Sequence, residues 1–256
     1  QVVGIFPLAQ YRTTMKDGMF KLLGFSGGTQ SDRNDVIVYP DYQKEVADLF
    51  ENEIIKLLKN VDLVYLNSIP IESKLIQSPL VNKLNTVSIH NSLPYLRLSN
   101  TTYEQIENDW KKSNRGDVRR QLRRLSEIGN IKLTRIDKRE NAIKLVDMFL
   151  VTHSKRWGKK YNKLYASINN FYKELINLLW DKGVIHFTTL DLNDKPVSYH
   201  FGFLYHNRFY YYKPVYDTNY ANYSPGKLHI SKLIEDGIKH RWDTFDFLLG
   251  DESYKY

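Results

Sequence analysis

Three aromatic-rich segments follow one another so closely along the chain that few arrangements are open to them. They read "VIHFTTLDL", "PVSYHFGFLYH" and "RFYYYKPVY", and they are joined by turns at "NDK" and "NR", the second of which includes the first residue of the third segment. Valine, tyrosine, phenylalanine and threonine favour strands, and connections this short join antiparallel neighbours. Residues 184–216 are therefore predicted to form an antiparallel meander. The smaller, more polar face of the middle strand, which we expect to line a site, carries Ser198, His200, Gly202 and Leu204.

Predicted strands and helices alternate through the rest of the chain. In the first part, "VVGIFPL", "MFKLLGF" and "VDLVYLNSI" read as strands around an amphipathic helix over residues 41–60, followed by a short helix and a strand over 72–90. In the second part, helices are expected over about 103–128, 139–156, 168–182 and after Pro225, with the further strands "IKLTRI" and "TFDFLLG". The pattern predicts an α/β (α+β) fold with mixed sheets flanked by helices. We place the domain boundary near residues 99–102, which gives domains at 1–101 and 102–256.

Charge and composition narrow the functional classes. The 256 residues carry a formal net charge of +8, which favours anionic partners such as phosphates, nucleic acid or an anionic membrane surface, although a basic surface also arises without such a partner. The absence of cysteine excludes thiol nucleophiles, thiolate zinc sites and disulfides, and it fits a reducing compartment. No apolar run reaches the ~18 residues of a membrane span. No signal peptide is visible, and a chain that begins at Gln1 is expected to be a trimmed fragment.

The stretch "NYSPGKLHISKLIEDGIKHRW" contains an unusual helix start. Ser224 is predicted to be the N-cap residue, with its hydroxyl accepting a hydrogen bond from the first turn, and Pro225 occupies the first helical position. Gly226 has no side chain to cover the backbone, and Lys227 places a cation at the positive end of the helix dipole. If the backbone N–H groups of Gly226, Lys227 and Leu228 have no acceptor within the protein, they would suit a bound phosphate. The simpler alternative is a capped helix with a surface lysine.

A row of arginines in "SNRGDVRRQLRRL" is a second candidate for anion binding. Arg115, Arg119 and Arg123 are spaced to line one side of a helix, with apolar residues on the opposite side. Such a row suits phosphates, RNA or anionic lipid. A solvated basic face is the alternative, and it is the commoner arrangement for a single helix.

Candidates for acid–base chemistry gather near the end of the chain, in "FDFLLGDESYKY". Asp246 lies inside an apolar strand, which is costly for a carboxylate without a partner. Asp246 and Glu252 are candidate general bases, and Tyr254 is a candidate general acid. For Asp246, a buried structural hydrogen bond is an equally good explanation. His200 is the only histidine expected near a site, with a core position as the alternative, and no histidine spacing supports a metal.

The closing stretch "YDTNYANYSPGKLHISKLIEDGIKHRWDTFDFLLGDESYK" closely resembles the motif of the CelD/BcsL-type acetyltransferases, a branch of the GNAT superfamily related to the FemAB aminoacyltransferases. That family carries a Ser-Pro-Gly helix start, here at residues 224–226, followed by Asp-Phe-Leu-x-Gly-x-Glu-x-Tyr-Lys, here at residues 246–255. The helix after "KKSNR", the "HSKRWG" stretch and the early segment from "GIFPLA" to "GFSGGTQSDRNDVIV" are similar as well. The usual GNAT loop, Gln/Arg-x-x-Gly-x-Gly/Ala, is missing.

The resemblance implies a tandem GNAT-like acyl-CoA N-acyltransferase fold, with the first domain shortened at its start and the donor site in the second. A splayed pair of parallel strands would admit the pantetheine arm of acetyl-CoA or another acyl-CoA, and the pyrophosphate would rest on the helix start at residues 224–228. The acceptor would be a small-molecule or glycan amine, such as an amino sugar or another cell-envelope or exopolysaccharide precursor. Its expected contacts are Asp217, Tyr220, Tyr223, Arg156, Trp157 and Lys255.

The expected reaction is direct attack of the amine on the thioester, because a chain without cysteine cannot form a cysteine acyl-enzyme. Two alternatives stay open. One is a Fem-like transferase that takes its acyl group from aminoacyl-tRNA. The other is a GNAT-fold protein without catalysis that binds an anionic glycan or nucleic acid through Arg115, Arg119 and Arg123. No metal is expected, and the expected location is the cytoplasm or the inner face of the membrane.

Overall fold

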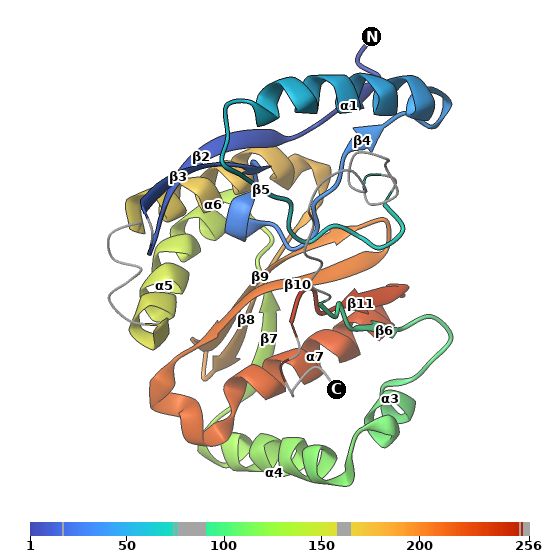
Figure 1. The fold of residues 1–256 in the computed structure, drawn as a ribbon. Coiled ribbons are helices and arrows are strands. Elements are labelled where there is room, and N and C mark those ends of the chain that lie inside the picture. Colours follow the sequence, from blue (N-terminus) through green and yellow to red (C-terminus); the bar gives the residue numbers. More distant parts are fainter. Residues whose placement is uncertain (17, 74, 76–90, 158–164, 251, 253–256) are drawn as a thin grey trace. The chain divides into compact units, whose positions relative to one another are not determined.

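A computed structural model describes residues 1–16, 18–73, 75, 91–157, 165–250 and 252 (Figure 1). Contacts divide the chain into two compact units, Gln1–Ser92 and Leu93–Tyr256. The division comes before the boundary expected at residues 99–102, because strand β6 (Tyr95–Arg97) pairs with β11 (Thr244–Asp246) in the sheet of the second unit. Most of the helix and strand expected over residues 72–90 lies outside the described residues.

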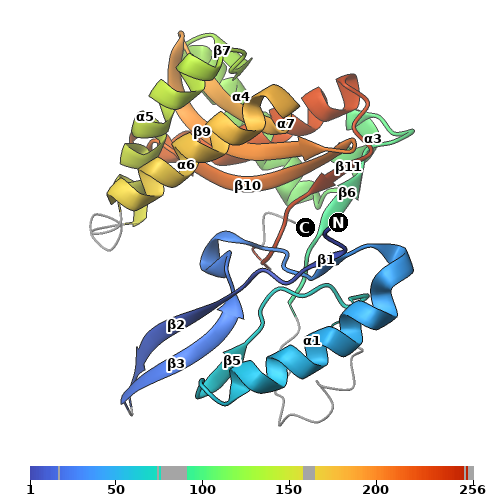
Figure 2. The same cartoon turned by 90° about the horizontal axis from the view of Figure 1, so that it is seen from above.

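The first unit contains two small sheets and a long helix. A three-stranded sheet has the order β2-β3-β5, and a second sheet pairs β1 with β4. These strands are β1 (Gly4–Ile5), β2 (Leu8–Met15), β3 (Gly18–Phe25), β4 (Ile37–Val38) and β5 (Leu63–Tyr65), with 3-10 turns η1 (Gly28–Gln30) and η2 (Pro40–Tyr42) between them. Helix α1 (Gln43–Leu58) lies beside the larger sheet (Figure 2) and packs Ile54 against Leu23 and Phe25. The assignment of this unit as a GNAT-like domain stays a prediction.

The second unit is built on a six-stranded mixed sheet in the order β6-β11-β10-β9-β8-β7. Strands β8, β9 and β10 form the predicted antiparallel meander, whereas β10 and β11 run parallel. Both hairpin turns hold two successive residues at positive φ, Asn193 with Asp194 and His206 with Asn207, a conformation that matches the twist of the joined strands. The strands not yet bounded are β7 (Ile131–Arg135), β8 (Ile185–Leu192), β9 (Lys195–Tyr205) and β10 (Arg208–Tyr216).

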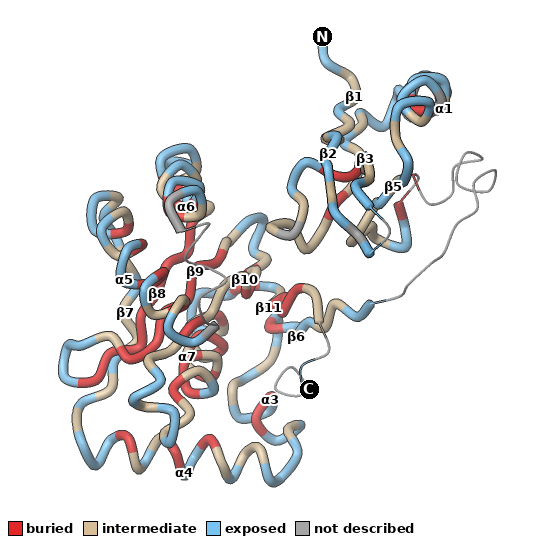
Figure 3. The backbone as a smooth tube through the Cα atoms, turned by 60° about the vertical axis from the view of Figure 1, so that its left-hand side comes forward, coloured by how far each residue is buried: buried red, intermediate tan, exposed pale blue. Residues whose placement is uncertain are grey.

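Helices cover both faces of this sheet (Figure 1). Helices α5 (Arg139–Trp157) and α6 (Tyr165–Leu179), the latter extended by the 3-10 turn η4 (Trp180–Lys182), pack on one face. Helix α7 (Pro225–Lys239) packs on the other face. The central strands β8 and β9 are buried between the two layers along most of their length (Figure 3).

The single helix expected over residues 103–128 is two helices. Helix α3 (Tyr103–Asp109) begins with a capping box, in which Thr102 Oγ1 accepts from the Gln105 amide at 3.2 Å and Gln105 Oε1 accepts from the Thr102 amide at 2.9 Å. Trp110 is extended, and α4 (Lys112–Ile128) begins after it. The capping box fixes where α3 begins, and the extended Trp110 separates the two helices.

Candidate functional site

The parallel strands β10 and β11 stay paired over only a short distance. Their pairing runs from Arg208 to Tyr210 on β10, and β11 ends at Asp246, opposite Tyr210. β10 continues to Tyr216, and its pairing with β9 shifts register between Tyr210 and Lys213. Beyond Tyr210, no strand in the described part of the chain pairs with β10 on its β11 side. This open edge of β10 is where a splayed parallel pair would admit an extended ligand.

Helix α7 follows β10 through the 3-10 segment η5 (Thr218–Tyr223), and its first turn differs from the prediction. Ser224 is the N-cap residue, as predicted, but it adopts a left-handed conformation with φ of 50° and its side chain makes no capping hydrogen bond, so the predicted bond to its hydroxyl is wrong. The Ser224 carbonyl instead accepts from the amides of Lys227 at 3.0 Å and Leu228 at 3.2 Å. The amides of Gly226, Lys227 and Leu228 were all expected to lack an acceptor. Among them, only the Gly226 amide donates to no described residue.

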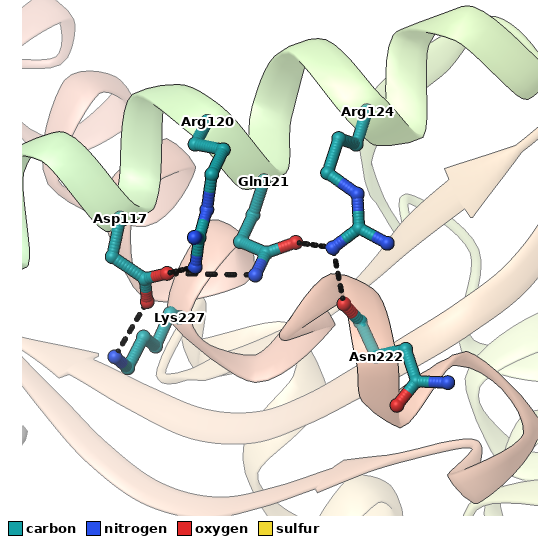
Figure 4. A network of polar contacts seen from close by, with 6 residues as sticks. All are labelled: Asp117, Arg120, Gln121, Arg124, Asn222 and Lys227. Carbon is teal, nitrogen blue, oxygen red and sulfur yellow. Dashed lines mark hydrogen bonds and ion pairs between the residues drawn. The ribbon is translucent and has the colours of Figure 1, made fainter.

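Gly226 and Lys227 each have a contact within the protein. A Cβ atom on Gly226 would approach Cδ1 of Tyr216 to 3.3 Å, so glycine allows this ring to pack closely against the helix start. Lys227 Nζ donates to Asp117 Oδ2 at 2.9 Å, which joins α7 to α4 (Figure 4). This bond is the largest cause that holds the pKa of Asp117 below its usual value. The unusual helix start therefore has structural explanations as well as the proposed functional one.

Cations outnumber carboxylates in the network around this helix start (Figure 4). Asp117 Oδ1 also accepts from Arg120 Nη2 at 2.7 Å, and Arg124 Nη1 donates to the Asn222 carbonyl at 3.0 Å. The network drawn contains three cations, Lys227, Arg120 and Arg124, and a single carboxylate, that of Asp117, to which Lys227 and Arg120 donate. The surplus of positive charge adds to the positive end of the helix dipole and favours an anion at this position.

The arginine row on α4 is largely engaged in contacts between helices. Arg119 forms two hydrogen bonds to the Glu107 carboxylate, at 3.0 and 2.5 Å, and this pairing is the largest cause of a lowered pKa at Glu107. Arg115 donates to Asn108 Oδ1 at 2.8 Å. Two of the three arginines in the row therefore bind α3, which agrees better with a structural role than with a polyanion-binding stripe.

Asp246 is fully buried, and both of its carboxylate oxygens are bonded. Oδ2 accepts from Arg208 Nε at 3.0 Å and from Arg208 Nη2 at 2.7 Å, while Oδ1 accepts from the Leu248 amide at 2.8 Å. The parallel register places Tyr210 opposite Asp246, two residues beyond Arg208 on the same strand face. A carboxylate held in this way fixes the end of β11, which favours the structural explanation over the role of general base.

His200 and the polar face of β9 lie in the core, beneath α7. The His200 ring stacks on Tyr211 with 4.4 Å between centroids, and no described residue hydrogen-bonds to its nitrogens. Burial holds its pKa well below the usual value, so it is a poor candidate for a base. The same face anchors α7, because His229 contacts Ser198 Oγ at 2.9 Å and Thr188 Oγ1 at 3.0 Å. The expectation that this face lines a site is wrong.

Gly202→Ala is expected to destabilise the second unit by about 1–3 kcal/mol. A Cβ here would collide with Cε1 of His200 and lie 2.6 Å from the Tyr210 carbonyl oxygen, which belongs to the backbone of β10. Gly116→Ala is the matched control, because nothing lies within 4 Å of a Cβ at that helical position, and it should stabilise by up to about 1 kcal/mol. Urea unfolding measures both, and equal effects of the two changes would contradict this account.

Three of the residues expected to contact the acceptor, Asp217, Tyr220 and Tyr223, lie in or next to η5, directly before α7. Asp217 caps η5 by accepting from the Asn219 amide at 3.0 Å. Tyr220 and Tyr223 are partly buried against a core cluster of α4 and β8 residues, and Arg124 lies 5.1 Å from the centre of the Tyr223 ring. Tyr220 and Tyr223 therefore contribute to packing, whatever their part in binding.

Of the remaining candidate site residues, some lie in the described part of the structure and some do not. Arg156, in the last turn of α5, lies 4.2 Å from the centre of the Tyr216 ring. Trp157 ends α5, and its side chain is outside the described part of the structure. Glu252 is exposed, whereas Tyr254 and Lys255 lie outside the described residues. The structure thus brings Arg156 towards Gly226, since both contact Tyr216.

Several residues at this site were not singled out from the sequence. Each of four residues contacts a candidate residue or the helix start: Arg208, Asp117, Tyr216 and His229. A carboxylate buried on β11, such as Asp246, needs a partner nearby, and this need could have been read from the sequence. Arg208 can be identified as that partner only from the parallel register of β10 and β11. The pairing of Asp117 with Lys227 joins residues far apart in the sequence and left no local signal.

The described residues contain no group of three or more histidine, aspartate or glutamate side chains placed to hold a metal ion. Within the same part of the chain, no helix combines the length and apolar character needed to cross a membrane.

Comparison with protein families finds a match to the acetyltransferase (GNAT) domain over residues 112–256, more than half of the chain. The match includes α4, the open edge of β10 and the start of α7. A comparison with curated proteins finds no match to the chain.

Solved structures share the fold along nearly the whole chain. A conserved protein of unknown function from Bacteroides thetaiotaomicron has a TM-score of 0.58 at 10% identity, covering 96% of this chain and 79% of that one. L-PGS from Bacillus licheniformis has a TM-score of 0.56 at 10% identity, covering 95% and 70%. The C-terminal domain of a putative lysylphosphatidylglycerol synthetase from Agrobacterium fabrum has a TM-score of 0.55 at 9% identity, covering 94% and 70%. Because the family match spans more than half of its length, this chain belongs to the acetyltransferase (GNAT) domain family.

Proposed function

We propose that this chain transfers an acyl group from an acyl-CoA, in the simplest case acetyl-CoA, to an amine. The observation that carries the proposal is the open edge of β10 beyond Tyr210, followed along the chain by the cationic start of α7. Donors and acceptors on an open strand edge suit an extended arm such as pantetheine. The positive end of a helix and its surrounding cations suit a pyrophosphate. Membership of the GNAT family supports the same assignment.

The proposed reaction joins donor and acceptor directly. The lone pair of the amine attacks the thioester carbonyl carbon, a C–N bond forms, and the C–S bond breaks to release the CoA thiolate, which takes up a proton. A backbone amide of β10 beyond Tyr210 would stabilise the developing oxyanion. Holding both substrates at one place supplies a large part of the rate. The chain has no cysteine thiol that would form a covalent intermediate.

Of the three candidate bases, Glu252 is the one that we propose. Its side chain is exposed, whereas Asp246 is bound by Arg208 and His200 is sealed in the core. Glu252 would take a proton from the attacking amine, and the resemblance assigns the return of a proton to the thiolate to Tyr254.

The acceptor is proposed from the resemblance to the CelD/BcsL-type acetyltransferases. It would be an amino sugar or another cell-envelope or exopolysaccharide precursor that carries a free amine. A protein that modifies such a precursor would work in the cytoplasm or at the inner face of the membrane.

Lys227→Glu is expected to weaken acetyl-CoA binding at least about tenfold, because it reverses a charge at the proposed pyrophosphate position. Calorimetric titration of the full chain with acetyl-CoA measures the dissociation constant. Lys232→Glu is the matched control, since it reverses a charge further along the same helix and also breaks an ion pair, with Glu235 at 2.8 Å.

Equal losses in the two variants, or no loss in Lys227→Glu, would contradict the placement of the pyrophosphate on the helix start. Absence of acetyl-CoA binding by the wild type would contradict the acyl-CoA donor itself. Titration with aminoacyl-tRNA and with a polyanion would then separate the two alternatives.

A further inference from the structure

Polar and aromatic side chains share one face of the second unit's sheet at its β6 edge, where β6, β11 and β10 lie side by side (Figure 1). The pairing register sets these residues in two rows of three, which we call the arginine–tyrosine face: Arg97, Thr244 and Arg208, then Tyr95, Asp246 and Tyr210. The residues that alternate with them, such as Phe209 and Phe245, pack in the core cluster that includes α7 residues. The arginine–tyrosine face is therefore the side that α7 does not cover.

Arg208 is held in a fixed orientation on this face. Its Nε and Nη2 donate to Oδ2 of the buried Asp246, at 3.0 and 2.7 Å. Its guanidinium carbon lies 5.8 Å from the centre of the Tyr95 ring and 5.9 Å from that of Tyr210, within the range of a cation–π contact. No described residue accepts from Nη1, and 35% of the side chain is exposed. The bonds to Asp246 thus orient the guanidinium and leave N–H donors for a ligand.

Arg97 adds the charge that makes this face cationic. Asp246 neutralises Arg208, whereas Arg97 is exposed and pairs with no acceptor in the described part of the chain. Only β11 separates the strands of the two arginines, so their backbones lie about 10 Å apart at the usual spacing of strands. Side chains as long as these can meet on one bound group. The arginine–tyrosine face has a net positive charge, which favours an anion.

The arginine–tyrosine face ends where the open edge of β10 begins. Tyr210 and Asp246 are the last paired residues of β10 and β11. The proposed site for the donor phosphates is the start of α7, and α7 packs on the opposite face of the sheet. A group bound on the arginine–tyrosine face would therefore lie beside the open edge but across the sheet from α7.

We propose that Arg97 and Arg208 bind a phosphate or carboxylate group of the acceptor. The inference rests on the proposed function and narrows its acceptor to an amine that also carries an acidic group. The anion would hold the acceptor on the arginine–tyrosine face, and its amine would extend past Tyr210 to the thioester at the open edge. Asp246 is then a positioning residue, which orients Arg208 and takes no proton from the amine.

Calorimetric titration with inorganic pyrophosphate, using the full chain saturated with coenzyme A, tests this site. Coenzyme A fills the proposed donor site, so pyrophosphate reports on a second one. Arg97→Gln is expected to bind pyrophosphate at least about fivefold more weakly than wild type, because it loses a hydrogen bond between charged groups. Arg135→Gln is the matched control and should bind as wild type does, since Arg135 is also exposed but lies on β7, at the other edge of the same sheet.

A conservative change tests Arg208. Arg208→Lys keeps the charge next to Asp246 and loses the planar fork, so it should weaken pyrophosphate binding by a similar factor. Circular dichroism verifies that the variant is folded. If it does not fold, Arg97→Gln and its control decide the matter alone.

Titration with malonate separates the two kinds of acid. A loss of affinity for either anion in Arg97→Gln supports the site, and the anion that wild type binds more tightly indicates whether the acceptor carries a phosphate or a carboxylate. If wild type saturated with coenzyme A binds neither anion, or if Arg97→Gln and Arg135→Gln lose affinity equally, the site is overturned. A wild type that binds pyrophosphate through Arg97 but does not bind coenzyme A would contradict the proposed donor and leave the anion site standing.

Discussion

Lowering the pH from 7 to 5 is expected to reduce the free energy of unfolding by about 4 kcal/mol or more, because histidines buried in the second unit, His186 and His229 above all, bind protons more weakly in the folded chain than in the unfolded one. His186, His200 and His229 are almost completely buried. Burial lowers the pKa of His186 and of His229 to about 3, and it lowers the pKa of His200 well below 6.5. At pH 5 the rings of His186 and His229 would therefore be protonated in the unfolded chain and neutral in the folded one.

The sign of the effect follows from where the proton binds. A histidine whose folded pKa lies below its unfolded value of about 6.5 binds protons preferentially in the unfolded state, so acid favours unfolding. Stability is therefore fully present above about pH 6.5 and falls as the pH drops towards about 3. His186 and His229 each cost about 2 kcal/mol at pH 5, a large share of the 5–15 kcal/mol typical of a domain, and His200 acts in the same direction.

His186→Phe isolates one of these contributions. The His186 ring lies 5.0 Å from Phe209 and 5.1 Å from Trp242 by centroids, and no described residue hydrogen-bonds to its nitrogens. Phenylalanine should therefore be accommodated, and the loss of stability between pH 7 and pH 5 should shrink by about 2 kcal/mol. Urea unfolding at both pH values, followed by tryptophan fluorescence, measures the difference.

His206→Asn is the control for this series. It removes an exposed histidine from the turn between β9 and β10, where asparagine tolerates the positive φ of 46°. It should leave the pH dependence unchanged. A wild-type protein that is equally stable at pH 7 and pH 5 would contradict the account of the buried histidines.

Asp246→Ala is expected to destabilise the second unit by about 3 kcal/mol, near the lower end of the cost of breaking a buried ion pair. The carboxylate is fully buried, but the Arg208 side chain keeps 35% of its surface exposed and can regain water. The substitution also leaves the Leu248 amide without its acceptor. Equilibrium unfolding of the purified chain measures the loss.

The same variant separates the two explanations of Asp246. Asp243→Ala, at an exposed position just before β11, is the matched control and should change stability little. Arg208→Gln should destabilise by an amount that is not additive with Asp246→Ala, because the two residues share one interaction. If Asp246→Ala kept full stability but lost transfer activity, Asp246 would be the general base and the structural explanation would fail.

Features set by neighbouring residues were predictable from the sequence. The meander of β8, β9 and β10 follows from three strand-forming runs with short turns, and those turns hold Asn193, Asp194, His206 and Asn207 at positive φ. Helices α5 and α7 begin where their sequence signals place them. The mixed sheet flanked by helices is accordingly the fold that the structure shows.

Features set by distant contacts were not predictable in the same way. Ser224 is the N-cap residue that its type predicts, yet its backbone is left-handed and its hydroxyl makes no capping hydrogen bond, so only its carbonyl accepts from amides of the first turn. The partner of Lys227 lies 110 residues away on α4, and the partner of Asp246 lies 38 residues away. The buried side of β9 looked like a site because it is polar, but α7 supplies His229 to bond to that face.

Hydrogen–deuterium exchange of the full chain, with and without acetyl-CoA, tests the central claim most directly. Binding at the open edge of β10 and the start of α7 predicts slower exchange in peptides that cover residues 211–216 and 225–228, with no change in β2 and β3 of the first unit. No protection in those two peptides, or protection confined to the arginine row of α4, would contradict the proposed donor site.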